Sequence, residues 1–148
     1  MTGISSAGCG FLLAVLWFDL MFDSQTRRHR TGSLPEDTLA SIVAYYRRVT
    51  TEAFPMNRLV ALAMVTTVVS MTVQLVESSS TTSLVLVALA CATSAIGLAI
   101  MRTMRSAVRL GRRADDDHTA SLLARTIFRD HVTSFVLMAV ALVAINMA

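Results

Sequence analysis

Lysine is absent from this chain of 148 residues, and charged residues of every kind make up only 16% of it. Soluble domains carry about 25%. Apolar residues make up 54% of the sequence, so too few charged side chains remain to cover a water-exposed surface. This composition excludes an ordinary water-soluble globule and predicts an integral membrane protein.

Cysteine is also scarce. The two cysteines, Cys9 and Cys91, each lie inside an apolar run, so the sequence encodes neither a disulfide framework nor a cysteine-rich metal site. It has no nucleophile elbow, no glycine-rich phosphate loop and no paired-histidine spacing of the kind that zinc or haem requires. We therefore predict no cofactor and no metal. The best metal constellation that a fold could assemble would comprise Asp19, Asp23, Asp130 and His131.

The sequence does contain four long apolar runs, at about residues 4–22, 55–76, 83–101 and 132–147, and the one arginine within them is Arg58, near the start of the second run. A helix needs about 20 apolar residues to cross the hydrocarbon core of a bilayer. The runs therefore predict an all-α bundle of four transmembrane helices, which forms a single integral membrane domain over residues 1–148. No basic residue precedes the first run and no small-x-small cleavage site follows it, so we expect a retained span and not a secretory signal.

All thirteen basic residues are arginines, and they fall within two segments, residues 27–58 and 102–129. Short loops rich in arginine stay on the cytoplasmic side of a membrane. Both connections, at about residues 23–54 and 102–131, are therefore predicted to be cytoplasmic, with both termini outside, in a bacterial-type inner membrane. This topology accounts for the net charge of +3, so the predicted partner is the lipid bilayer and not nucleic acid.

The first connection contains a predicted amphipathic helix over about residues 35–50. Ser33 and Glu36 have the capping-box spacing, and apolar residues then recur at helical intervals. These are Leu39, Ile42, Val43 and Tyr46. The stripe can lie in the lipid headgroup layer or pack on the bundle, and an amphipathic helix suits both arrangements.

The second connection is predicted to be a hairpin of two helices that extend the third and fourth spans. No proline or glycine interrupts the chain between Met101 and Gly111, so the third span should continue past its apolar run. The three consecutive aspartates at 115–117 then supply caps for a helix that starts near His118 and leads into the fourth span.

Asp19 and Asp23 are the candidate catalytic residues. They lie four positions apart, on one face of the predicted first helix, and an acid inside an apolar run is costly unless it has a partner. We expect a ring of basic groups at the same level on the other spans, as candidate substrate-binding residues: Arg58, Arg102, Arg129 and His131. One interpretation is a polar pocket in which an aspartate acts as acid, base or cation site. The preferred one is an interlock of charge pairs that fixes the helices, because four spans leave little room for a large aqueous cavity.

A small-residue face on the third run comprises Ala88, Ala92, Ala95 and Ala99. Small side chains let two helix backbones approach closely. This face is predicted to be a helix interface, either within the chain or with a second copy or another membrane protein.

Three functions are compatible with these features, in order of preference. An interaction or accessory subunit comes first, because the chain offers packing surface and no complete catalytic set. The alternative is a small membrane enzyme acting on a lipophilic substrate, such as a quinone-, sterol- or polyketide-like molecule, with Asp19 or Asp23 as acid or base and an arginine binding an oxyanion. An oligomeric transporter or channel is third, since one chain of four helices is barely large enough to enclose a pore.

The predicted orientation is tested by thiol labelling of intact cells. A membrane-impermeant reagent should label an engineered Ser79→Cys from outside and spare Ser33→Cys, each compared with the unmodified chain. The reverse pattern would overturn the orientation.

Overall fold

The computed structural model describes residues 2–77 and 82–148, and within these ranges it contains helices and no strand. The elements in chain order are α1 (Thr2–Asp23), η1 (Ser24–Arg28), α2 (Glu36–Arg47), η2 (Arg48–Glu52), α3 (Met56–Glu77), α4 (Thr82–Leu98), η3 (Ala99–Thr103), α5 (Met104–Gly111) and α6 (Asp117–Met147). The first short segment, η1, is a 3₁₀-helix, whereas η2 and η3 are π-helical. The all-helical prediction is confirmed. The predicted break between the second and third runs falls largely on residues 78–81, outside the described ranges.

Within the described residues, four helical stretches are long and apolar enough to span a membrane: Thr2–Arg28, Met56–Glu77, Ser83–Gly111 and Asp117–Met147. Each contains most or all of one predicted span. The last two extend beyond their apolar runs as expected, because α4, η3 and α5 follow one another without a break and α6 is 31 residues long. The predicted hairpin of two long helices is therefore present, with α5 in contact with α6.

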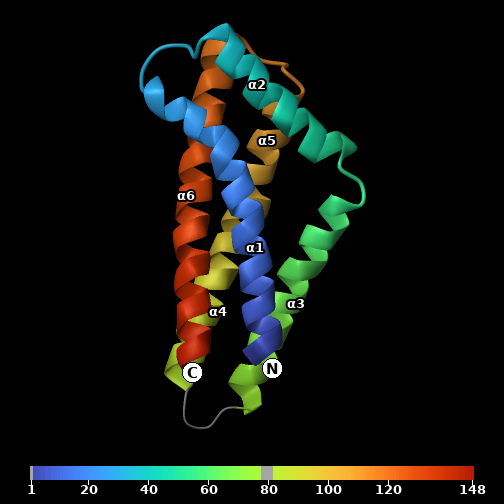
Figure 1. Cartoon of the computed structure of the whole chain (residues 1–148), viewed down its shortest axis with the longest axis vertical. Helices are drawn as coiled ribbons and strands as arrows, with labels where there is room; N and C mark the ends of the chain where they lie inside the picture. Colours follow the sequence, from blue (N-terminus) through green and yellow to red (C-terminus); the bar gives the residue numbers. More distant parts are fainter. Residues whose placement is uncertain (1, 78–81) are drawn as a thin grey trace.

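The helices α1, α4 and α6 run side by side, and α3 contacts α1 and α4 (Figure 1). Both termini lie at one end of the bundle, and α3 leans away from α1 toward its own first residue (Figure 1). At the opposite end, α2 crosses the bundle and packs on α5. We call this opposite end, formed by residues 23–58 and 102–131, the arginine-rich end.

Small side chains let α4 pack closely on α6 in the half of the bundle near the termini. Ala88, Ala92 and Ala95 are buried in the same apolar cluster as Ala141 of α6. Three of the four predicted interface alanines thus pack within the chain, and Ala99 is half-buried. Contact of this face with a partner would require the bundle to open.

The helix α2 packs on the bundle through the stripe that the sequence indicates. Leu39, Ile42, Val43 and Tyr46 are all buried, in a second apolar cluster that they share with residues of α5 and α6. Of the two arrangements considered for this helix, the structure therefore has the packed one.

The capping-box prediction for Ser33 is wrong. Pro35 occupies the N-cap position of α2, and no side chain caps the helix. Instead Leu34 is buried, and its backbone N–H donates to Ser121 Oγ of α6 at 2.9 Å. This tertiary bond fixes the start of α2. At the start of α6, Asp116 holds the N-cap position as predicted, but its side chain makes no capping hydrogen bond.

Gly111 sets how closely α5 approaches α2. A Cβ at this position would lie 2.8 Å from the backbone nitrogen of Arg47 and 3.0 Å from the backbone carbon of Tyr46. Gly111→Ala is therefore expected to destabilise the fold by about 1–3 kcal/mol, because neither backbone can yield locally. A Cβ at Gly97 has nothing within 4 Å, so Gly97→Ala is the matched control. Thermal unfolding in detergent should show a lower midpoint for Gly111→Ala only, and equal midpoints would contradict the packing described.

Candidate functional site

A buried carboxylate joins three helices at the arginine-rich end. Asp23, the last residue of α1, has no exposed surface. Tyr46 Oη of α2 donates to its Oδ1 at 2.6 Å, and His131 Nδ1 of α6 lies 2.7 Å from its Oδ2. Because an ionised carboxylate only accepts hydrogen bonds, Nδ1 is assigned as the donor.

Asp19 lies one turn earlier on α1 and faces the other nitrogen of the same histidine. Its Oδ1 accepts a 2.6 Å hydrogen bond from Tyr45 Oη, and its Oδ2 is 3.8 Å from His131 Nε2. That distance allows charge attraction but is too long for a direct hydrogen bond. The Tyr45 ring stacks on Phe22, with 4.0 Å between the ring centroids, which holds the phenol in place.

We call Asp19, Asp23, His131 and the two tyrosines bound to the aspartates the carboxylate–histidine cluster. The two phenols of this cluster act as hydrogen-bond donors and not as proton-transfer groups. Burial is the main cause that raises the pKa of Tyr45, and the negative charge of Asp19 raises it further. Burial is likewise the main cause that raises the pKa of Tyr46, and the charge of Asp23 adds to it. Both phenols therefore keep their protons over any physiological pH, and each remains bound to one aspartate.

Asp130 forms a separate pair beside the cluster. Its Oδ1 is 3.0 Å from Arg102 Nη2, and its Oδ2 accepts a 3.3 Å hydrogen bond from Thr103 Oγ1. The carboxylate is buried, whereas the arginine side chain is more than half exposed. This ion pair joins η3 to α6 next to His131 in the sequence.

A cavity of about 410 Å³ adjoins the cluster and lies between α1, α2, α3, α6 and the α4–η3–α5 helix. Most of its lining is apolar, from side chains such as Leu12, Met64 and Met138. The polar lining residues are Asp19, Tyr45, Tyr46, Thr50, Asn57, Thr103, His131 and Ser134. An apolar chamber with a few polar groups at one place is typical of a small-molecule site.

One buried polar atom of the cavity lining lacks a partner among the described residues. Ser134 Oγ is buried and has no hydrogen-bond partner among the described residues. The serine is three residues, about one helical turn, after His131 on α6. A buried hydroxyl without a partner costs free energy, so this group is suited to bind a polar atom of a ligand.

Both π-helical segments border the cavity. Thr50 of η2 and two residues of η3, Ala99 and Thr103, line it. A π-helical turn is strained relative to an α-helix and is frequent at functional sites.

The predicted ring of arginines around the aspartates does not form among the described residues. Arg102 pairs with Asp130, whereas Arg58 lies over the ring of Phe54, 4.5 Å from its centroid. Arg129 is exposed. The prediction placed these arginines by their level along the bundle, but the direction in which each points is set by its own helix.

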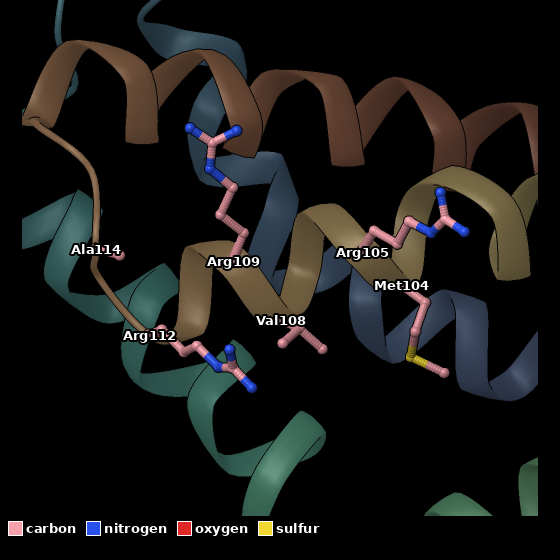
Figure 2. A pocket seen from close by; sticks show the side chains of 6 residues that line it. All are labelled: Met104, Arg105, Val108, Arg109, Arg112 and Ala114. Atoms are coloured by element: carbon pink, nitrogen blue, oxygen red, sulfur yellow. The ribbon is translucent and has the colours of Figure 1, made fainter.

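A second depression, of about 400 Å³, runs along α5 and is shown in Figure 2. Arg105, Arg109 and Arg112 line it, but their guanidinium groups point in different directions (Figure 2). Arg109 is already paired with Asp115, with nitrogen–oxygen distances of 2.6 and 2.7 Å. The depression is open and offers no convergent set of donors.

Of the predicted site residues, the structure brings together Asp19, Asp23 and His131, and it places Arg102 next to them through Asp130. Within residues 2–77 and 82–148, no group of three histidine, cysteine or acidic side chains has the geometry to hold a metal ion. Tyr45 and Tyr46 were not predicted as site residues. Tyr46 could have been identified from the sequence, because it lies in the apolar stripe of α2. A tyrosine in such a stripe is expected to be buried, and a buried phenol needs a hydrogen-bond acceptor.

Comparison with known proteins gives no match to any family model, curated protein or solved structure.

The two aspartates are expected to differ in their contribution to stability. Asp23→Ala leaves two buried donors without an acceptor and should cost about 3–5 kcal/mol. Asp19→Ala removes one hydrogen bond at a less buried position and should cost about 1.5–3 kcal/mol. Asp117→Ala, at an exposed residue 3.6 Å from Arg113, should cost less than about 1 kcal/mol. Thermal unfolding of the three variants in detergent checks this order, and a similar loss in all three would contradict it.

Proposed function

We propose that the chain is a four-span integral membrane protein that binds a lipophilic small molecule in the cavity beside Asp19 and His131. The observation that carries the proposal is the combination of a mostly apolar chamber with hydrogen-bonding groups gathered on part of its wall. Such a chamber suits a molecule with an apolar body and a single polar group.

The arginine distribution supports an orientation with the arginine-rich end in the cytoplasm and both termini outside. The two termini lie at the same end of the bundle, which an even number of spans requires (Figure 1). In this orientation, the carboxylate–histidine cluster lies near the cytoplasmic boundary of the membrane. The polar group of a bound ligand would then sit near that boundary and its apolar body deeper in the bilayer.

The lean of α3 supports direct access from the bilayer. Phe18 of α1 and Met56 of α3 line the cavity and are also 61% and 51% exposed. They lie on the two helices that diverge toward the arginine-rich end (Figure 1). A lipophilic molecule dissolved in the membrane would reach the chamber between these helices without passing through water.

Ligand binding thus takes precedence over the accessory-subunit function that the sequence favours. The accessory role and an oligomeric transporter stay predictions. A transport path would have to cross the apolar lining around Leu12 and Met138, where no charged side chain of the cavity wall lies. A membrane enzyme acting on a lipophilic substrate fits the same cavity and is a special case of the proposal.

Photolabelling with benzophenone, a neutral lipophilic probe, tests the binding site. Labelling of Met64, which lines the cavity and is half-buried, should saturate with probe concentration. Labelling of Met147, which is 68% exposed, should rise linearly as the detergent phase fills with probe. Quantitative mass spectrometry of the labelled peptides distinguishes the two behaviours.

Two leucine variants on the same helical stretch provide the control. Ala99→Leu adds volume inside the cavity and should reduce Met64 labelling several-fold. Ala90→Leu adds the same volume at an exposed position of α4 and should leave the labelling unchanged. Parallel labelling of Met64 and Met147 in all variants would refute the proposed site.

A further inference from the structure

We infer that the ligand carries an acidic hydroxyl group, such as a phenol or an enol, and that His131 Nε2 accepts its proton. The inference rests on the proposed function, because the hydroxyl must be held in the cavity by the apolar body of the same molecule. It assigns His131 as the base, Ser134 as the group that binds the resulting oxyanion, and Asp23 and Tyr46 as positioning residues.

The hydrogen bonds of His131 leave one nitrogen available. Nδ1 is committed to the fully buried Asp23 carboxylate at 2.7 Å. In a neutral ring whose Nδ1 carries the hydrogen, Nε2 holds a lone pair and is the acceptor. His131 lines the cavity, and its Nε2 makes no hydrogen bond among the described residues, with Asp19 Oδ2 3.8 Å away. This is the orientation that a general base requires, with one nitrogen fixed by a carboxylate and the other facing the substrate.

Two carboxylates favour the protonated form of the ring. Asp23 accepts its hydrogen bond directly, and Asp19 Oδ2 lies 3.8 Å from Nε2. A positive charge on the largely buried imidazole is therefore attracted from both sides. Asp19 is too distant to bind Nε2 directly, so the nitrogen stays free for a ligand. Asp130, the third acid nearby, is already paired with Arg102.

Ser134 supplies the matching donor. Ser134 lines the same cavity, and its hydroxyl is buried and has no partner within the described parts of the chain. Tyr45, Tyr46 and Thr103 also line the cavity, but each already donates to an aspartate. Among these hydroxyls, Ser134 is the one whose hydrogen has no acceptor assigned. One acceptor on His131 and one donor on Ser134 complement a hydroxyl group, which donates one hydrogen bond and accepts another.

The proton transfer is balanced within the site. The O–H bond of the ligand breaks, its proton forms the Nε2–H bond, and the electron pair stays on oxygen, where the aryl ring or double bond delocalises it. Asp23 stabilises the imidazolium, and the Ser134 hydroxyl donates to the oxyanion. No oxidant, reductant or further reactant is needed.

The test uses 4-nitrophenol and its methyl ether, 4-nitroanisole, with the purified full chain in mild detergent. The phenol changes its absorption spectrum when it ionises, and the ether has no proton to give. At a pH where free 4-nitrophenol is mostly neutral, the protein-bound phenol should show phenolate absorption; where the ring is already protonated at that pH, the same imidazolium–phenolate pair forms and the proton of the phenol goes to solvent. It should also bind about tenfold or more tightly than the ether, as expected for a hydrogen bond to a charged group.

Two variants separate the roles of the residues. His131→Gln should abolish the phenolate absorption and bind both probes equally. Ser134→Ala removes an unpartnered hydroxyl, so the fold should tolerate it; the phenolate absorption should persist while the affinity for the phenol falls toward that of the ether. Saturable benzophenone labelling of Met64 confirms that each variant is folded with its cavity intact.

The outcomes distinguish this inference from the proposed function. If 4-nitroanisole binds but bound 4-nitrophenol stays neutral, or ionises equally in His131→Gln, the inference is wrong and lipophilic binding stands. If neither probe binds and Met64 labelling does not saturate, both are wrong.

Discussion

The Asp23 carboxylate is the constraint on which the arginine-rich end depends. It is the one acid without any exposed surface in the described ranges, and its two oxygens bind groups from α2 and α6. A buried carboxylate with a partner missing would be far less stable than one with both. The position of α2 across the bundle, and the orientation of the His131 ring, therefore follow from satisfying this single group.

The interlock and the functional pocket, which the sequence presents as alternatives, occupy different aspartates. Asp23 is enclosed and serves the interlock, although its partners are Tyr46 and His131 and not the arginines that were expected. Asp19 is less buried and lines the cavity. The two acids lie one turn apart on the same helix but have different surroundings. The helix α2 covers Asp23, whereas the turn that contains Asp19 stays open toward α3.

Much of the helical framework could be predicted from the sequence, since apolar runs of membrane-spanning length and the stripe at Leu39, Ile42 and Tyr46 depend on local periodicity. Asp19 and Asp23 were identifiable as acids that needed partners. The partners of these aspartates could not be predicted. The height of a residue along a helix axis follows from its position in the sequence, whereas the direction in which its side chain points depends on how the helices pack. Arg58 illustrates this: it lies at the expected level but stacks on Phe54. The cavity depends on the lean of α3, which no local pattern encodes.

The π-helical turn η3 shifts the spacing of buried residues along the third long helix. In a regular α-helix, the buried face that contains Ala92 and Ala95 would return near positions 102 and 109, and Arg109 would point into α2. One additional residue in η3 rotates everything after it by about 100°, so Ala107 and Leu110 are buried and Arg109 is exposed. The two halves of the helix are therefore out of phase by one position. A single deletion within this turn would therefore let the helix continue as a regular α-helix with Ala107 and Leu110 still on the buried face, whereas a regular α-helix of the full sequence would turn Arg109 onto that face.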